Sequence, residues 1–507
     1  MIIFGVGLTV ILVLVVGIVV ARKIDGDSTN YLVAGRRLGL PLVAVSLTAA
    51  AVDSNATVGN TDLTASFGFW SGASLALGLA ICLFLSGLFL AKPMNRMKLL
   101  TLADFFRIRY NRPTEIVASL IMITSFTALL AGNLVACGFL LEHFANLPYS
   151  WGVGVSAALV LSYTLAGGLF SDAYTAVIQT VITVVAAVSL FCWVLLSYGI
   201  VIPAGMGPLD LGQLTDSAQG APINWATLIA LGIGDLVAID FMQRIFGAKS
   251  PETAQRACFI GAAGTAVIGT LFALVALTAS SVLGISSDDG PVLYTLLGDY
   301  APPLLAVLVL SGIVAASFST ASGAILAVSA VAVRNVFSVR RGDTGGPDPL
   351  LRWTRAAMAP IVLASVILAV RVSQTGILLT LAFDIMLACL AAPLILGLFW
   401  TRPGASAALA AAGVGLTVRL AFLSVTPTLY GVPNDILYID NNLVTEAFDG
   451  WATLLAAAIG IGTYCITALV HQRSADEMLN SQRQERGLAR EQEELELPTQ
   501  VPAAVTG

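Results

Sequence analysis

Long apolar runs separated by short polar loops constrain this chain more than any other feature of its sequence. Each run reaches roughly the 20 residues (range about 17–25) that an α-helix needs to cross a bilayer. The runs cover residues 2–22, 41–62, 69–91, 114–141, 150–169, 174–200, 223–246, 256–283, 303–333, 356–372, 376–400, 404–424 and 450–470. Only 11% of the residues are charged, about half the fraction of a soluble domain. The sequence therefore predicts an all-α polytopic membrane protein with about 13 transmembrane helices.

Basic residues divide the connections between these runs into two alternating sets. One set holds most of the Lys and Arg residues, in the loops near residues 22–37, 92–112, 249–256, 334–355 and 402. The longer loops of the other set, 142–149, 202–222, 284–302 and 425–449, contain no Lys or Arg. The positive-inside rule then predicts a protein of the cell membrane with its N-terminus outside and its C-terminal tail in the cytoplasm.

Two of the apolar runs are interrupted by acids and glycines at about membrane depth. In the run 41–62, Asp53, Ser54 and Asn55 precede Gly59. An ionised carboxylate there costs at least ~2.5 kcal/mol. Such polar backbone is tolerated only where it is buried in protein or lines a cavity. We therefore expect an interrupted helix at a binding site.

The second interruption lies five spans later, in the run 223–246, which crosses in the opposite direction. It contains two glycines, Asp235, Asp240 and Arg244. Two broken helices at corresponding positions of two halves are typical of an inverted-repeat transporter, with the site between them. The predicted solute-binding residues are Asp53, Ser54, Asn55, Asp235 and Asp240.

Three further polar positions inside the apolar runs leave two interpretations open. The hydroxyl-rich segment 311–323 either packs small residues between helices or supplies oxygen ligands to Na⁺. Asp172, after the glycine pair 167–168, belongs either to a plain cytoplasmic corner or to the coupling machinery. Asp384 is either a hydrogen-bonded packing residue or a second coupling residue.

Several segments resemble the sodium:solute symporter family, and the resemblance covers the chain up to about residue 470. The matching segments are NYLVAGRRLG (30–39), TLADFFRIRY (101–110), YTLAGGL (163–169) and FSTASGAILA (318–327). Within the family, segments 86–94, 241–244 and 382–384 are most similar to the high-affinity choline transporter branch.

This resemblance implies a leucine-transporter-like core of five plus five helices and Na⁺-driven uptake. It also implies a sodium site made by backbone carbonyls of the first broken helix and by the ninth span. Carried over to this sequence, the Na⁺ ligands are Ala49, Val52, Ala316, Ser319 and Thr320. The implied division is 1–40 for the first helix and loop, 41–400 for the transport core, 401–471 for additional helices and 472–507 for a tail.

The chain departs from the family pattern at two places. The acid that usually follows the threonine after the glycine pair is replaced by Ala176, and we expect Asp172, four residues earlier on the same helical face, to compensate. The tryptophans that surround choline in the choline transporters are replaced by Ala51 and Ala238. Carboxylates in place of ring faces favour a solute that donates hydrogen bonds, such as a primary or secondary amine, a polyol or an amide.

The leading hypothesis is a Na⁺-coupled symporter that imports a small polar organic solute, which can be cationic, by alternating access. The first alternative keeps this fold but couples uptake to protons, since five intramembrane acids are present. The second is a sensory or channel-like membrane protein. No nucleophile–base set or metal spacing suggests an enzyme, and no nucleic-acid partner is expected.

The tail 472–507 is predicted to be disordered, with a short solvated helix as the alternative.

Overall fold

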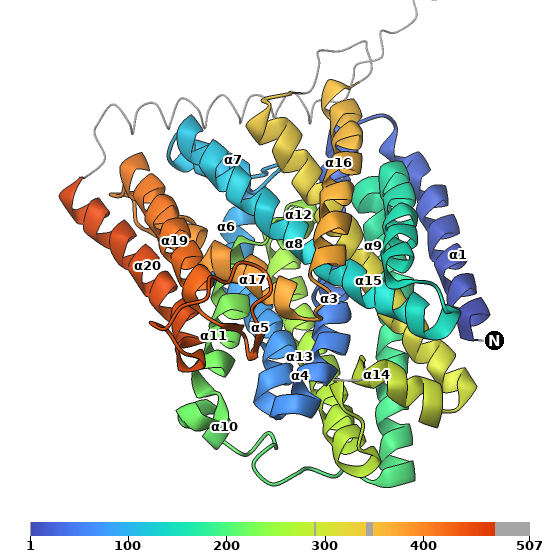
Figure 1. The fold of residues 1–507 in the computed structure, drawn as a ribbon. Coiled ribbons are helices and arrows are strands. Elements are labelled where there is room, and N and C mark those ends of the chain that lie inside the picture. Colours follow the sequence, from blue (N-terminus) through green and yellow to red (C-terminus); the bar gives the residue numbers. More distant parts are fainter. Residues whose placement is uncertain (1, 288–289, 341–347, 472–507) are drawn as a thin grey trace, which may run out of the picture.

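The protein is a bundle of long helices, seen here in a computed structural model that describes residues 2–287, 290–340 and 348–471 (Figure 1). The predicted disordered tail lies outside the described residues. The helices are α1 (Ile2–Val20), α2 (Ser28–Val33), α3 (Leu40–Ala51), α4 (Asn60–Phe67), α5 (Phe69–Leu85), α6 (Ala91–Arg96), α7 (Ala103–Arg109), α8 (Arg112–Ala145), α9 (Tyr149–Tyr198), α10 (Gly212–Thr215), α11 (Ala221–Ile233), α12 (Ile239–Gly247), α13 (Pro251–Leu283), α14 (Val292–Thr295), α15 (Pro303–Val331), α16 (Pro349–Arg371), α17 (Ile377–Met386), α18 (Ala392–Phe399), α19 (Ala405–Val425) and α20 (Trp451–Val470). A short antiparallel hairpin, β1 (Thr428–Leu429) and β2 (Val432–Pro433), precedes α20.

The number of membrane spans depends on how bent helices are counted. Among the described residues, 10 helices are long and apolar enough to cross a membrane, or 12 if each of two bent pairs is one span. The 50-residue α9 contains Gly168 with φ 50° and ψ −150°, which is not helical. Dividing α9 at this glycine would add one span, so the predicted count of thirteen stays a prediction that depends on this position.

Local sequence explains where several long helices begin. Asn111, Ser250 and Asp348 each accept a hydrogen bond from a backbone N–H in the first turn of α8, α13 and α16. A proline stands at the first or second position of each of these helices. A short polar side chain satisfies an otherwise unpaired N–H, and proline fits the first turn because it needs no donor there.

The two predicted sets of loops gather at opposite ends of the bundle (Figure 1). At the end with basic loops, Leu38 pairs with Ala248, and Arg112 donates to Ser338. At the other end, Trp70 donates to Pro208, and Asp62 accepts from the backbone N–H of Val292. The alternation of loop charge thus corresponds to a real separation in space. We call the first end the predicted cytoplasmic side and the second the predicted outer side.

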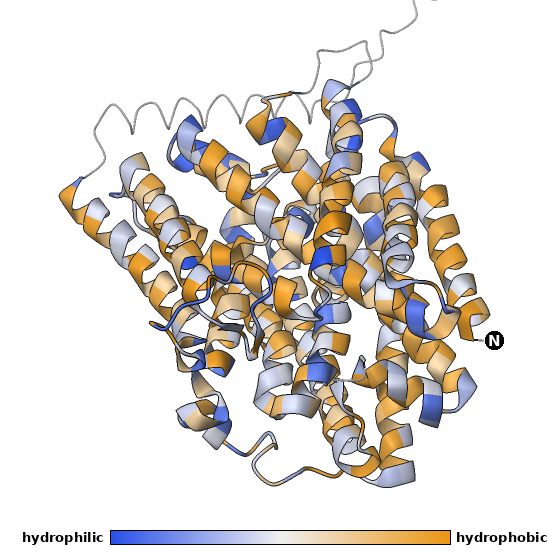
Figure 2. Cartoon of the chain, viewed as in Figure 1, coloured by the Kyte–Doolittle hydropathy of each residue, from blue (hydrophilic) through white to orange (hydrophobic). Residues whose placement is uncertain are grey.

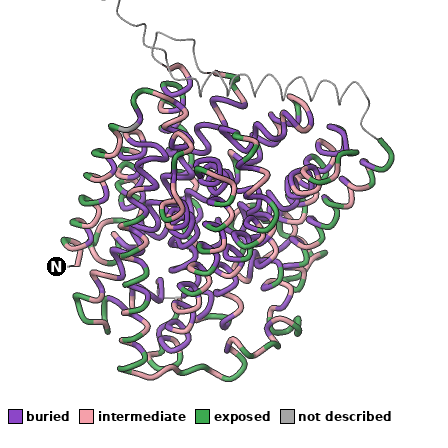
Figure 3. Tube along the Cα trace, turned by 180° about the vertical axis from the view of Figure 1, so that it is seen from behind, coloured by how far each residue is buried: buried purple, intermediate pink, exposed green. Residues whose placement is uncertain are grey.

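Apolar residues make up most of the length of the helices, while hydrophilic residues concentrate near the helix ends and at isolated interior points (Figure 2). The buried residues lie in the middle of the bundle, and exposed residues are spread over its outer helices (Figure 3). Large apolar residues such as Phe4 and Leu196 remain 79% and 85% exposed. Such an apolar exterior suits a lipid environment, where it needs no protein partner.

The first predicted interruption is confirmed. Leu40–Ala51 and Asn55–Phe67 meet at an angle of 56°. Val52 leaves the helical region with ψ 71°, and Asp53 lies between it and the second half, which begins at Asn55. The Oδ1 atom of Asp53 accepts from the backbone N–H groups of Asn55 and Ala56 at 2.9 and 3.0 Å. The carboxylate therefore supplies acceptors for N–H groups that the break leaves without helical partners.

The other oxygen of Asp53 is held by two amides. Its Oδ2 atom accepts from the side chains of Asn55 and Asn133, both at 2.8 Å. Ser54 in turn donates to the Oδ1 atom of Asn133 at 3.0 Å. This arrangement ties the break to α8 and satisfies both oxygens of a carboxylate that is 1% exposed.

The second predicted interruption is also confirmed, with an angle of 49° between Ala221–Val237 and Ile239–Gly247. A single 3₁₀ turn, Gly234–Val237, ends the first half, and Ala238 is extended with ψ 116°. Asp240 lies in the first turn of α12 and accepts from the N–H of Phe241 at 2.7 Å. Carboxylates thus accept backbone hydrogen bonds at the start of the second half of both broken helices, where the helix dipole favours negative charge.

Replacing Gly168 by Ala should strongly destabilise the protein. A Cβ atom there would lie 2.4 Å from the carbonyl oxygen of Tyr31, and the backbone angle φ of +50° disfavours an L side chain. Strain and overpacking together predict a loss of about 3 kcal/mol. Thermal unfolding in detergent measures this loss. Gly154→Ala, with nothing within 4 Å of its Cβ position on the same helix, is the control; equal stability of the two variants would contradict the prediction.

Asp53→Ala should lower stability by about 3 kcal/mol, because it removes a helix cap, leaves the Asn55 amide without an acceptor and leaves the Asn133 amide only the Leu129 carbonyl. Asp235→Ala is a matched control, since neither oxygen of that buried carboxylate accepts a hydrogen bond from an N–H or O–H group among the described residues. We expect no loss of stability in the control. Similar melting temperatures for both variants would show that Asp53 does not hold the break together.

Candidate functional site

The two breaks face a common cavity in the middle of the bundle. Ten residues line it: Ala50, Asp53, Leu79, Leu129, Asp235, Asp240, Phe241, Thr320, Leu379 and Phe383. Its volume is about 10 Å³, about the space that one water molecule needs. We call it the midplane cavity. Its walls combine three carboxylates with apolar side chains from α5, α8, α12 and α17.

The three carboxylates of the midplane cavity differ in how they are satisfied. Both oxygens of Asp53 are used at the first break, as described above. Asp240 accepts from the Nη1 atom of Arg244 at 3.3 Å. Asp235, 1% exposed, accepts no hydrogen bond from an N–H or O–H group within the described part of the chain, and the weakly donating thiol of Cys82 lies beside it. Asp235 is therefore the carboxylate of this cavity that has no N–H or O–H donor, and its role in solute binding stays a prediction.

The structure thus brings together three of the five predicted solute-binding residues. Ser54 and Asn55 do not line the cavity. Their side chains donate instead to Asn133 and to Asp53. They support the acid rather than face the cavity, and a direct role for them in solute binding stays a prediction.

Two rings at the cavity, Phe241 and Phe383, were not anticipated from the sequence. The two positions at which the choline transporter resemblance would place aromatic rings are occupied by small residues, Ala51 and Ala238. Instead, Phe241 lies in the first turn of α12 and Phe383 lies on α17. Both rings lie in segments that resemble the choline transporter branch, 241–244 and 382–384, and each is adjacent to an acid in the sequence.

The predicted sodium ligands lie where α15 passes the first break. Thr320 donates its hydroxyl to the carbonyl of Ala50 at 2.9 Å, which joins the two elements. Since α3 ends at Ala51, the carbonyls of its last turn lack the donors that a continuous helix would give them. Ser319 is 0% exposed, and its hydroxyl has no partner among the described residues. Carbonyls and hydroxyls at this junction are suited to holding Na⁺, and the ligand set itself stays a prediction.

Asp172, predicted to act in coupling, belongs to a buried ion network on the predicted cytoplasmic side of the cavity. Its Oδ2 atom accepts from the Nη2 atom of Arg244 at 2.9 Å. Its Oδ1 atom accepts from the hydroxyl of Ser322 on α15 at 2.8 Å. Arg244 also donates to Ser46 on α3 at 2.9 Å. One arginine therefore connects both broken helices with α9.

Asp384, the other predicted coupling residue, lies in a separate network. It accepts from Arg419 on α19, from the hydroxyl of Tyr430 at 2.8 Å and from Thr453 on α20 at 3.2 Å. Burial raises the pKa of Tyr430 well above its usual value, and the Asp384 carboxylate raises it further. The hydroxyl therefore keeps the proton that it donates. These contacts fasten the C-terminal helices to α17, and the coupling role of Asp384 stays a prediction.

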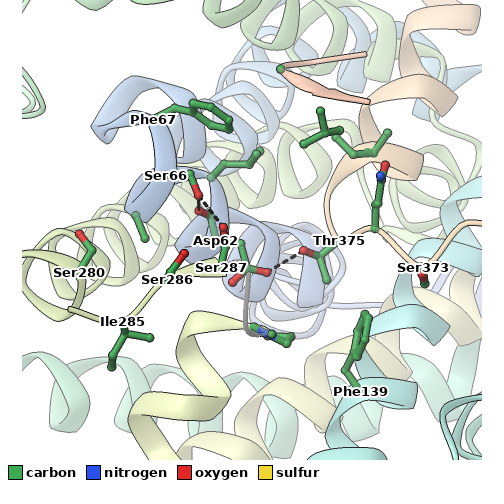
Figure 4. Close-up of a pocket in the computed structure, with 18 of the residues that line it drawn as sticks. Asp62, Ser66, Phe67, Phe139, Ser280, Ile285, Ser286, Ser287, Ser373 and Thr375 are labelled. Carbon is green, nitrogen blue, oxygen red and sulfur yellow. Dashed lines mark hydrogen bonds between the residues drawn. The ribbon is translucent and has the colours of Figure 1, made fainter. Parts of the chain in front are cut away.

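A much larger cavity opens at the predicted outer side (Figure 4). Its volume is about 720 Å³, within the range of ligand pockets. Asp62 points across it to the hydroxyl of Thr375 at 2.7 Å, and Ser66 contacts Ser287 at 2.7 Å. Leu63 and Ile377 belong to this cavity.

The outer and midplane cavities follow the same two helices. Asp53 and Asp62 lie on the first broken helix, while Ile377 and Leu379 lie on α17. Between the two cavities, a Cβ atom on Gly59 would lie only 3.0 Å from the backbone of Gly376. This contact leaves no room for a side chain at Gly59.

Comparisons with known proteins agree with this arrangement. The family model of the sodium:solute symporter family matches residues 31–415. The high-affinity choline transporter 1 of Drosophila melanogaster is 23% identical over 81% of this chain and 69% of that protein. The osmoregulated proline transporter OpuE of Bacillus subtilis is 25% identical over 83% of this chain and 89% of its own length.

Solved structures show the same fold. A substrate-bound, outward-open Na⁺-coupled sialic acid symporter superposes with a TM-score of 0.72 at 17% identity, covering 92% of this chain and 98% of the other. The nucleobase-cation-symport-1 family transporter Mhp1 superposes with a TM-score of 0.56 at 15% identity, covering 89% and 98%.

The expected family is therefore confirmed by a match over most of the chain, and the expected fold by the arrangement of its helices. This multi-pass membrane protein belongs to the sodium:solute symporter family, whose members are transporters that move a solute together with Na⁺.

Proposed function

We propose that the chain imports a small organic solute carrying a protonated amine, together with Na⁺, across the cell membrane. The solute would bind in the midplane cavity, and Na⁺ would bind where α15 passes the first break. Alternating access would move the two broken helices relative to α15. The proposed orientation places the outer cavity outside the cell and the Arg244 network on the cytoplasmic side.

The observation that carries this proposal is the unpaired carboxylate of Asp235. Buried charges in proteins are normally paired, because leaving one unpaired costs several kcal/mol. Asp53 is held by amides and Asp240 by Arg244, whereas Asp235 has neither a cation nor an N–H or O–H donor as partner among the described residues. A cationic solute would supply the missing partner, and its N–H groups would donate to the free oxygens.

The walls of the cavity limit the rest of the solute. Leu79, Leu129 and Leu379 offer apolar surface, and the rings of Phe241 and Phe383 border the same space. Ring faces attract cations, which supports a positively charged solute. The small volume indicates that the site must widen before a solute enters.

The named relatives are compatible with such a solute. Choline and proline both carry a positively charged nitrogen, but only the secondary amine of proline has N–H donors. An unpaired carboxylate gains hydrogen bonds as well as charge pairing from a donor of this kind. This supports a primary or secondary amine over a quaternary ammonium.

A second candidate uses the same observation. A buried carboxylate without a partner can also carry a proton, because protonation removes the cost of its charge. The chain would then couple uptake to protons through Asp235. Uptake driven by a pH gradient in the absence of Na⁺ would favour this candidate, and uptake that requires a Na⁺ gradient favours the first.

Asp235→Asn should raise the KM for an amine solute at least ~100-fold, because it removes the negative charge that would pair with the ammonium. The measurement is uptake of labelled primary, secondary and quaternary amines, amino acids and sugars into proteoliposomes with a Na⁺ gradient. Asp299→Asn, at an exposed acid on the predicted outer side, is the matched control. Unchanged KM in the Asp235 variant would rule out this carboxylate as the solute's partner.

The double substitution Ser319→Ala with Thr320→Ala should abolish the dependence of uptake on the Na⁺ gradient, because it removes both hydroxyl ligands while keeping the carbonyls. Ser329→Ala is a suitable control, since this serine is also buried on α15 with an unpartnered hydroxyl. The readout is initial uptake rate against Na⁺ concentration. A double variant with the Na⁺ response of the parent protein would place the ion elsewhere.

A further inference from the structure

Arg244 is a fully buried cation surrounded by oxygen atoms from several helices. It is 0% exposed and lies on α12, on the predicted cytoplasmic side of the second break. Its guanidinium contacts the Oδ2 atom of Asp172, the hydroxyl of Ser46, and the carbonyl and Oδ2 atom of Asp240. The four N···O distances are 2.9, 2.9, 3.1 and 3.3 Å.

The same oxygens would make a site for a small hard cation if Arg244 were absent. Hard cations take carboxylate, carbonyl and hydroxyl oxygens, and all three kinds are present. The hydroxyl of Ser46 also lies 3.4 Å from Asp172, and the hydroxyl of Ser322 holds the other oxygen of Asp172 at 2.8 Å. The two serines fix the carboxylate from α3 and α15, independently of the arginine.

The shape of α15 is adapted to the guanidinium. A Cβ atom on Gly323 would lie 2.8 Å from the Nη2 atom of Arg244 and 3.0 Å from its Nη1 atom. Any larger residue at this position would displace the guanidinium. The space beside Asp172 therefore fits the guanidinium of Arg244, a large cation that is part of the chain itself.

This buried cation lies next to the proposed sodium site. The hydroxyl of Ser322, which holds Asp172, also lies 3.0 Å from the carbonyl oxygen of Ser319. Ser319 is one of the proposed Na⁺ ligands, so a single turn of α15 joins the two places. Arginine stays protonated in proteins, and its fixed charge disfavours a second cation at Asp172.

We propose that Arg244 is a tethered cation that fills a second cation site made by Asp172, Ser46 and Asp240, so that the chain moves one Na⁺ with each solute. This inference rests on the proposed Na⁺ site at Ser319. Removing the arginine while keeping Asp172 would open the second site to Na⁺. The competing explanation is that Arg244 only blocks the path of the solute to the cytoplasm and does not affect how many Na⁺ ions bind.

Binding of ²²Na⁺ to the purified full chain and the Na⁺ dependence of uptake test the proposal directly. The unmodified protein should bind one Na⁺ per chain, with a Hill coefficient of about 1 for Na⁺. Arg244→Ala should bind a second Na⁺ and raise the Hill coefficient toward about 2, as expected for two coupled sites. Counting bound ions gives a result even if the variant no longer transports.

Two matched variants separate a cation site from a structural contact. Arg244→Lys keeps a tethered charge and should retain one Na⁺ per chain. Arg244→Ala with Asp172→Asn removes the carboxylate as well and should return from two bound ions to one. This reversal is not expected if Arg244 only blocks the path of the solute to the cytoplasm.

Two outcomes would overturn the inference: two Na⁺ bound by the unmodified protein, or one bound by a folded Arg244→Ala variant. Failure to purify that variant leaves the ion count of the unmodified protein as the decisive measurement. Absence of any Na⁺ binding in the unmodified protein would instead refute the sodium site on which the inference rests.

Discussion

The structure depends on one constraint: polar groups inside a membrane must find their partners within the protein. The break at Val52 leaves backbone groups without helical partners, and the carboxylate of Asp53 accepts two of the freed N–H groups. Asn133 then satisfies that carboxylate from a neighbouring helix. An acid that looks costly in the sequence is thus the group that makes the interruption possible.

The same constraint sorts the buried acids into distinct roles. Asp172 and Asp240 share Arg244, and Asp384 is paired with Arg419. Each of these carboxylates has a cation supplied by the chain itself. Asp235 does not have one among the described residues, and it is the acid best placed to take its partner from a solute. We therefore infer the proposed solute contact from an incomplete network rather than from the presence of an acid alone.

Small residues on α15 allow these networks to meet. Gly323 leaves room for the guanidinium, the hydroxyl of Thr320 donates to Ala50 at the first break, and the hydroxyl of Ser322 donates to Asp172. In lipid, close helix packing relies on small and hydroxyl-bearing residues. The two interpretations of this segment, helix packing and oxygen ligands, are therefore not exclusive, because close approach is what brings the oxygens together.

The membrane class, the alternation of loops and the two interrupted helices could be predicted from the amino-acid sequence. These features depend on local hydropathy, on charge and on the free-energy cost of a polar residue within its own span. All three are properties of short stretches of the sequence. The sequence also indicated Asp53, Asp235 and Asp240 as residues of one site, because the two breaks are spaced as in an inverted repeat.

Only the tertiary structure decided which of those acids has a partner. Asn133, Arg244 and Arg419 lie 80, 72 and 35 residues from the acids Asp53, Asp172 and Asp384 that they contact, and spacing along the chain does not reveal such pairs. The rings of Phe241 and Phe383 at the cavity were hidden for the same reason. A side chain's pairing depends on which helices pack together, and that information is absent from any single apolar run.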